Sequence, residues 1–319
     1  MSKSTSGSLA KEYCVKFPKA TNLGLARKLV KDYPLVFNSI EHARTLIRSY
    51  RHSLGSNKRK DKVERLELPK SDAEDWTPFI ITGVKKLLIL SDIHLPYHDV
   101  KALQIALDYG KEKGIDGILI NGDLFDFYKG SRFEQDPRKR GMVGEIEMGR
   151  HFFAYLRQEF DCPIFYKLGN HCERWEKYLM LKAPELLDMD EFRLDIILKL
   201  GEKRIQYITD KRIVKFGHLD ILHGHEFFGA PSQAVNPARG LFTKTLESCV
   251  IGHLHKTSSH TETTLNGKMI TTHSIGCLCD LHPEYARLNK WNLGFAICEI
   301  TKGQDYILHN KRIFNGEVY

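Results

Sequence analysis

The chain has 319 residues and a mass of 36.8 kDa, with 42% hydrophobic and 28% charged residues. This composition is that of an ordinary globular protein and excludes a fibrous or wholly disordered one. No apolar run approaches the roughly 18 residues of a membrane-spanning helix, and residues 1–11 lack the apolar stretch of a signal peptide. Seven cysteines in so long a chain favour free thiols, so we expect a cytoplasmic protein with no membrane partner.

Positive charge is concentrated at the start of the chain. Residues 1–70 contain 16 basic and 6 acidic residues, a net charge of +10, whereas the remainder contains 32 basic and 34 acidic ones. A basic segment beside a near-neutral body indicates an acidic partner, most often nucleic acid. We expect a small basic all-α module over residues 1–56, a linker over 57–76 and a larger domain over 77–319.

Two helices are predicted in the basic module. Apolar residues recur at helical spacing over 22–33, and Pro34 ends that run. A second helix is predicted from Asn38, with Glu41 completing a capping box, while residues 1–19 are expected to be polar and mobile. The pair is interpreted either as a helix-turn-helix unit that contacts nucleic acid or as a solvated helix packed on the main domain. The candidate nucleic-acid contacts are Arg44, Arg48, Arg51, Lys58, Arg59 and Lys60.

From residue 85 onward, short β-type runs alternate with helical stretches, which is typical of an α/β domain. Strands are predicted over 86–91, 117–121, 163–168, 220–222 and 249–251. Helices are predicted over 103–113, 142–160 and 173–182. Since ligands gather at the carboxyl ends of strands in open α/β sheets, the residue after each strand is a candidate for a functional site.

Asp, Asn or His follows each of the five predicted strands. The segments are Asp92-Ile93-His94, Gly122-Asp123, Gly169-Asn170-His171, His223-Gly224-His225 and Gly252-His253-Leu254-His255. Carboxylate, amide and imidazole donors without a thiolate suit Mn²⁺, Fe, Zn²⁺ or Ni²⁺. The candidates exceed what one ion needs, which predicts two ions and a carboxylate that bridges them. Such a pair can activate hydroxide and hold a phosphate for in-line displacement.

In this order, the five motifs resemble the calcineurin-like metallophosphoesterase superfamily over roughly residues 84–300. The resemblance implies an α/β/β/α sandwich of two mixed sheets flanked by helices. It also implies a cofactor of two divalent metal ions, with manganese the first candidate, and hydrolysis of a phosphate ester by a metal-bridging hydroxide. A basic helical module before such a domain further resembles proteins of phages and prophages.

The resemblance implies a role for each motif residue. One ion would be bound by Asp92, His94 and His255. The other would be bound by Asn170, His223 and His253, with Asp123 bridging the two. His171 would protonate the leaving oxygen or stabilise developing charge. Further substrate contacts are expected from Tyr97, His98, Arg174 and His225.

Some nearby residues have two readings. Asp126 either belongs to the site or caps a turn, and Arg174 either grips a phosphate or lies on a helix surface. Cys277 and Cys279 are too close together for a zinc site, and Arg138-Lys139-Arg140 is interpreted as a solvated loop.

Three functions remain open at this stage. The first is a phosphodiesterase or nuclease that acts on nucleic acid, for which the basic module would hold a polyanion. The second is a phosphomonoesterase of nucleotides or proteins, with the module as a docking element. The third is a non-catalytic nucleic-acid-binding protein that merely retains the fold. The sequence leaves the oligomeric state open.

Overall fold

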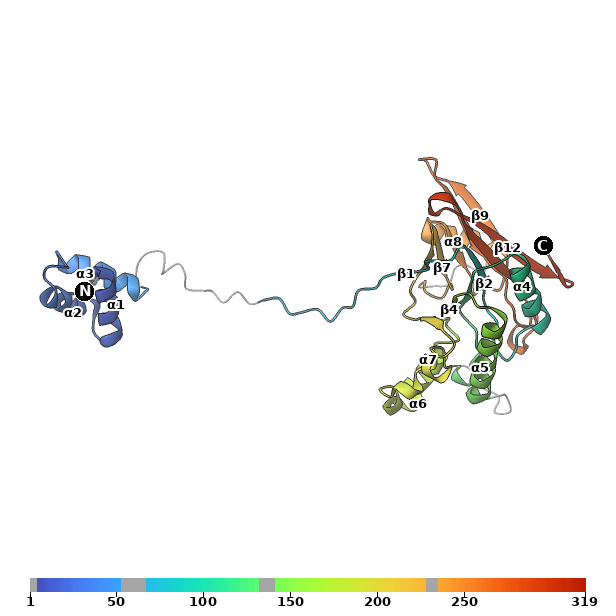
Figure 1. Cartoon of the computed structure of the whole chain (residues 1–319), viewed down its shortest axis with the longest axis horizontal. Coiled ribbons are helices and arrows are strands. Elements are labelled where there is room, and N and C mark those ends of the chain that lie inside the picture. The colour runs from blue at the N-terminus through green and yellow to red at the C-terminus, as the bar shows by residue number, and fades with distance from the viewer. Residues whose placement is uncertain (1–4, 53–66, 132–140, 228–234) are drawn as a thin grey trace. The chain divides into compact units, whose positions relative to one another are not determined.

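The computed structural model describes residues 5–52, 67–131, 141–227 and 235–319. The chain divides into two compact units, Met1–Glu74 and Asp75–Tyr319 (Figure 1). The predicted contacts Lys58, Arg59 and Lys60 and the loop 138–140 lie outside the described residues.

Residues 5–52 of the first unit form three helices around a core of their own, namely α1 (Ser6–Lys16), α2 (Asn22–Asp32) and α3 (Ile40–Tyr50). The expectation of a mobile segment was wrong for residues 6–16, because Leu9, Ala10 and Tyr13 give α1 a narrow buried face within a polar sequence. The start of α3 also differs from the prediction. Ser39, not Asn38, caps this helix, since its hydroxyl accepts a hydrogen bond from the His42 backbone N–H at 3.0 Å.

The larger sheet of the second unit contains seven strands among the described residues. They are β2 (Lys86–Leu90), β3 (Gly117–Asn121), β4 (Ile164–Lys167), β5 (Ile205–Ile208), β11 (Leu293–Ile300), β12 (Tyr306–Phe314) and β13 (Glu317–Val318). Their order is β13-β12-β11-β2-β3-β4-β5. Strands β2 to β5 are parallel to one another, whereas β11 is antiparallel to β2, so the sheet is mixed.

The second sheet contains six strands among the described residues. They are β1 (Phe79–Ile80), β6 (Val214–Phe216), β7 (Leu219–Leu222), β8 (Cys249–Ile251), β9 (Ser258–Thr263) and β10 (Met269–Ser274). Their order is β1-β6-β7-β8-β10-β9. This sheet is mixed as well, because β7 runs parallel to β8 but antiparallel to β6.

Helices cover the outer faces of both sheets. Helices α4 (Val100–Glu112) and α5 (Met142–Glu159) pack on the seven-stranded sheet, and α8 (Pro237–Thr245) packs on the other (Figure 1). Along β2, Leu88 and Leu90 face the helices, while Leu87 and Ile89 face the second sheet. Both faces of this strand are buried, which explains its unbroken apolar run. The expected α/β/β/α sandwich, preceded by an all-α module, is confirmed.

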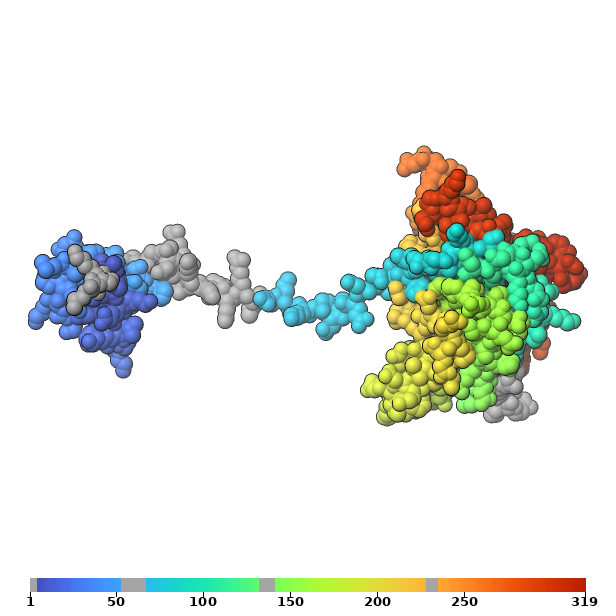
Figure 2. Space-filling model, in the orientation of Figure 1, coloured from blue at the N-terminus to red at the C-terminus, as the bar shows by residue number. Residues whose placement is uncertain are grey.

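Two further helices, α6 (Arg174–Lys182) and α7 (Leu194–Ile197), lie between β4 and β5. Figure 2 shows their segment as a lobe on the body of the second unit. In the described part of the chain, no helix is both long enough and apolar enough to cross a bilayer.

Candidate metal centre

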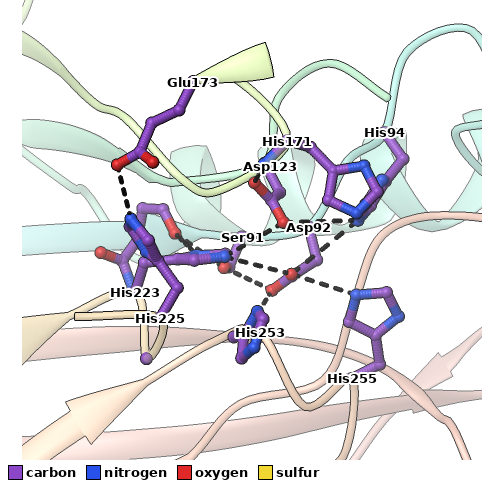
Figure 3. Close-up of polar contacts among 12 residues, drawn as sticks. Ser91, Asp92, His94, Asp123, His171, Glu173, His223, His225, His253 and His255 are labelled. Carbon is purple, nitrogen blue, oxygen red and sulfur yellow. Dashed lines mark hydrogen bonds and ion pairs between the residues drawn. The ribbon is translucent and has the colours of Figure 1, made fainter. Parts of the chain in front are cut away.

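Five strands deliver the predicted ligands to one place (Figure 3). In the larger sheet β2, β3 and β4 are parallel neighbours, and in the second sheet β7 and β8 are. Because the carboxyl ends of parallel neighbours lie at one edge, the segments after them meet between the sheets. The structure therefore brings the predicted Asp and His ligands together.

The backbone at this edge is unusual. Five motif residues have positive φ angles between 43° and 62°, a region that costs non-glycine residues about 1–3 kcal/mol each. They are Asp92, His94, Asp123, His253 and His255. Gly122 has a φ of 84° and lies against the His223 ring, so a side chain there would clash with the imidazole. The loops thus adopt strained backbone conformations that let their side chains converge.

Asp123 lies at the centre of one group of donors. Together with His223 and His253 it offers ligand atoms within 4.8 Å of one another. The Nδ1 of His223 donates to the Asn121 carbonyl at 2.8 Å, which turns the other ring nitrogen, Nε2, toward the cluster. That Nε2 lies 3.1 Å from Asp123 Oδ2 but without hydrogen-bond geometry, and it has no hydrogen-bond partner in the described part of the chain. Asn170 Oδ1 is also buried and has no hydrogen-bond partner among the described residues.

Asp92 anchors the second group. Its Oδ1 lies 3.1 Å from His255 Nε2, and its Oδ2 accepts the backbone N–H of His253 at 2.9 Å. The Nε2 of His94 is buried and has no hydrogen-bond partner among the described residues, while lying 3.9 Å from oxygens of both Asp92 and Asp123. Buried polar atoms are normally paired, so orphaned atoms aimed at one point fit a site for cations. The donor set suits divalent metal ions.

Charge in the cluster keeps the carboxylates ionised. Burial raises the pKa of Asp92, but the imidazoles of His255 and His223 outweigh it and hold the pKa below its ordinary value. The same opposition, with His223 and His171 as the main neighbours, lowers the pKa of Asp123. For His253, burial outweighs the attraction of the Asp123 and Asp92 carboxylates and lowers the pKa to about 4. Asp92, Asp123 and His253 thus have the charge states that bind metals. For His223 and His255 the neighbouring carboxylates outweigh burial and raise the pKa values to about 9 and about 10, so a cation must displace their protons.

His171 stands beside the cluster and is tied to Asp126. Its Nδ1 donates to the Asp126 carbonyl oxygen at 3.0 Å and lies 3.1 Å from the carboxylate Oδ1. Asp126 also lies 3.3 Å from His94 Nδ1, so it belongs to the site rather than capping a turn. Arg174 donates to the Asp126 carbonyl at 2.8 Å and to His171 Nε2 at 3.1 Å. The guanidinium therefore lies at the site and not on a free helix surface.

A buried ion pair supports the turn that carries His223. Glu226 accepts the backbone N–H of His223 at 2.9 Å and of Gly224 at 2.6 Å. Lys167, only 1% exposed, lies 2.9 Å from Glu226 Oε1. His225 lies between two carboxylates: its Nε2 is 2.9 Å from Glu173 Oε1 (Figure 3), and its Nδ1 is 3.8 Å from Glu226 Oε2. Sequence reasoning missed Lys167 and Glu226, because neither belongs to a recognisable motif.

The remaining predicted residues have mixed positions. Tyr97 lines a cavity beside His171, whereas His98 pairs through its backbone with Cys279. Arg51 of the first unit is turned inward, where it donates to the carbonyl of Phe17 at 2.8 Å and to Asn22 Oδ1 at 3.0 Å. Arg44 lies 3.4 Å from Glu41 on the surface of α3, the helix that also carries Arg48.

Cys279 is a further residue near the candidate metal ligands that the sequence did not suggest. Its sulfur lies 3.9 Å from His255 Nδ1, and with His94 and His255 it forms a third close group of donor atoms. A Cys-x-Cys pair alone gives no signal for this position, since only the fold brings the end of β10 beside β8.

Comparisons with known proteins agree with this geometry. The family model described as calcineurin-like phosphoesterase matches residues 85–257. The gene 54 proteins of Mycobacterium phages L5 and D29 are each 24% identical over 228 residues, which cover 68% of this chain and 89% of each relative. Both relatives are phage proteins, in line with the predicted resemblance.

Solved structures of low sequence identity are also similar. One is Vps29 from Entamoeba histolytica complexed with Zn²⁺, at 14% identity and a TM-score of 0.39, covering 73% of this chain and 96% of that one. Another is YfcE, a phosphoesterase from E. coli, at 16% identity and a TM-score of 0.33, covering 70% and 98%.

Proposed function

We propose, since the chain belongs to the calcineurin-like phosphoesterase family, that it is a metal-dependent phosphodiesterase acting on nucleic acid. The family places it among the hydrolases. The observation that supports metal dependence is a pair of buried, unpartnered ring nitrogens, His94 Nε2 and His223 Nε2, which both lie within 4.0 Å of the Asp92 and Asp123 carboxylates. The proposal for nucleic acid is carried by the net charge of +10 in residues 1–70.

Seven side chains are proposed as ligands for two divalent ions. Asp92, His94 and His255 would hold one ion. Asn170, His223 and His253 would hold the other, and Asp123 would lie between the two. Ions bound there supply Lewis-acid stabilisation of the phosphate charge and activation of water. Nitrogen and oxygen donors suit Mn²⁺, Fe, Zn²⁺ or Ni²⁺, and manganese is the first candidate to test.

The chain's own residues manage the proton. Asp126 fixes the tautomer of His171 by accepting from Nδ1, so that Nε2 is the atom that exchanges a proton with substrate. When His171 is protonated, the Asp126 carboxylate stabilises the imidazolium, and Nε2–H can be donated to the leaving oxygen. Arg174 must then release Nε2, which leaves its guanidinium free to pair with a phosphate oxygen.

The basic first unit is proposed to hold the polyanion. Arg44 and Arg48 are its candidate contacts on α3, whereas the Arg51 guanidinium donates to the Phe17 carbonyl within the unit. Seven free cysteines fit a reducing compartment, and we propose a cytoplasmic location.

The test compares hydrolysis of bis-p-nitrophenyl phosphate and p-nitrophenyl phosphate by the full chain with Mn²⁺. Asp123→Asn is the control for contaminating activity, and His171→Ala should bind metal yet lose about 100-fold or more in kcat. A diester preference that the Asp123→Asn variant lacks is the expected result. A monoester preference would instead favour a phosphatase, with the first unit as a docking element.

Nucleic-acid binding by the first unit is tested separately. Arg44→Glu with Arg48→Glu should weaken binding of single-stranded DNA and reduce its salt dependence. Glu12→Gln, at an exposed position on α1, is a control for altered surface charge in the same unit, and it should not weaken binding. Unchanged affinity in the double variant would remove α3 from the interface.

A further inference from the structure

A cavity of about 760 Å³ opens directly beside the candidate metal centre. His94, Asp126 and His171 form its inner wall, whereas Asp92, His223 and His253 do not line it. The volume is in the usual range for a small-molecule or cofactor site. The cavity therefore continues the site on the side of the proton donor, away from most of the proposed metal ligands.

The position of His171 decides which part of a substrate the cavity receives. In the proposed function, His171 donates a proton to the oxygen that leaves. In-line displacement places the leaving oxygen opposite the attacking one, and the group bound to it extends past His171. The cavity is lined by His171 and so lies on the side of the cluster where that group would extend.

The outer wall of the cavity is aromatic and carries charges of both signs. Tyr97, Tyr128 and Tyr285 line it, together with Arg174 and Arg287 and with the acidic residues Asp280 and Glu284. Tyr285 is 70% exposed, so its ring is accessible to a ligand in the cavity.

Tyr285 is also held in place from behind. Its ring packs edge-on against Trp291 at 6.2 Å, and Trp291 packs against the ring of His255 at 4.2 Å. A chain of aromatic contacts thus connects the exposed ring to a proposed metal ligand. A ring fixed in this way is a stacking platform rather than a free surface residue.

We propose that this cavity binds the nucleoside on the leaving side of a single-stranded nucleic acid, with its base stacked on Tyr285. The inference rests on the proposed function. A tyrosine-lined wall suits a planar base without sequence preference, because every base offers a π-face. Arg174 and Arg287 supply positive charge for the adjoining phosphates. A phosphate ester of a small or aliphatic alcohol would leave the tyrosines unused.

The test uses a single-stranded oligothymidylate of about twelve residues, with one thymine replaced by an abasic site. The full chain with Mn²⁺ is incubated with it, and the rate of cleavage is measured at each bond. The end groups of the products show which oxygen leaves and so identify the leaving nucleoside at each bond. Bonds distant from the abasic site serve as an internal reference.

Loss of one stacked base is worth a factor of about 5–150. We expect that factor at the bond whose leaving nucleoside lacks its base, and less than about twofold at the bond whose retained nucleoside lacks it. Tyr285→Ala should cut intact bonds at least about 5-fold more slowly and no longer distinguish the abasic position. The matched control is Leu288→Ala, a fully exposed neighbour outside the cavity lining, which should behave as the parent.

Two results would overturn the inference while leaving the proposed function intact. One is equal cleavage at all bonds, and the other is slow cleavage only where the retained nucleoside lacks its base. A different result would reject both. That result is no cleavage of any oligonucleotide by a chain that hydrolyses p-nitrophenyl phosphate in an Asp123-dependent way.

Discussion

Replacing Lys167 by Met is expected to destabilise the second unit by about 3–5 kcal/mol, because it leaves a carboxylate buried without its cation. Lys167 is 1% exposed, and its Nζ lies 2.9 Å from Glu226 Oε1 and donates to the Arg212 carbonyl at 2.7 Å. Methionine fills the same volume but supplies no charge and no donor. The two backbone N–H groups that Glu226 accepts remain and offset part of the loss.

The double variant Lys167→Met, Glu226→Gln separates the ion pair from simple packing. It buries no charge, so it should be less destabilised than the sum of the single variants, with a coupling energy of about 1–3 kcal/mol. The exposed pair of Lys268 and Glu247 is the matched control, and Lys268→Met should cost less than about 1 kcal/mol.

Urea unfolding followed by tryptophan fluorescence is the assay. All three tryptophans, Trp76, Trp175 and Trp291, lie in the second unit, so this signal reports its unfolding alone. The reasoning would be refuted if Lys167→Met cost no more than Lys268→Met. It would also be refuted if the effects of the Lys167 and Glu226 substitutions simply added.

Three further changes have defined outcomes. Burial raises the pKa of Glu145 to about 8, so the stabilisation from its protonated form is present below pH 4.5 and lost as pH rises through 8. In urea unfolding, the free energy of unfolding of Glu145→Gln should therefore equal that of the parent at pH 4 and exceed it by about 2–5 kcal/mol at pH 9. The same difference between variant and parent at both pH values would contradict this. Arg51→Ala should destabilise the first unit by about 2–4 kcal/mol, seen by circular dichroism, while the tryptophan midpoint stays constant. Chelation of divalent ions should lower the tryptophan midpoint and Mn²⁺ should restore it, with about 2.7 kcal/mol regained at a metal concentration of 100 Kd.

The sequence predicted the strands around the site well because each has a distinct boundary. The predicted bounds of β3 and β8 match the structure, since each apolar run ends at a polar motif. Motif order then indicated which loops would meet, and the structure brings them together at the edge of the two sheets. The ligand roles themselves stay predictions until metal binding is measured.

Features that depend on contacts between distant segments could not be predicted. Lys167 and Glu226 are 59 positions apart, and in the sequence each resembles an ordinary surface charge. Arg51 was predicted as a nucleic-acid contact because helical spacing says nothing about the carbonyls of Phe17 and Pro18, to which its guanidinium donates from the end of α3. The spacing of apolar residues assigns a face to a side chain, but only tertiary packing assigns its partner.

The strained backbone of the site lowers the stability of the second unit. Asp92, Asp123 and His253 have left-handed φ angles and lie among donor atoms that lack partners, so the metal-free site is unfavourable twice over. The hydrophobic layers on either side must stabilise the fold against both costs. Bound cations would satisfy the unpaired donors but would leave the φ angles unchanged. Metal binding should therefore recover only the stability lost to the unpaired donors.

Asp→Asn or His→Ala substitutions at these positions keep the backbone strain, whereas glycine at the same position relieves it. A glycine substitution is normally more destabilising than an alanine one. In the absence of metal, however, the free energy of unfolding of His253→Gly is expected to be at least as high as that of His253→Ala.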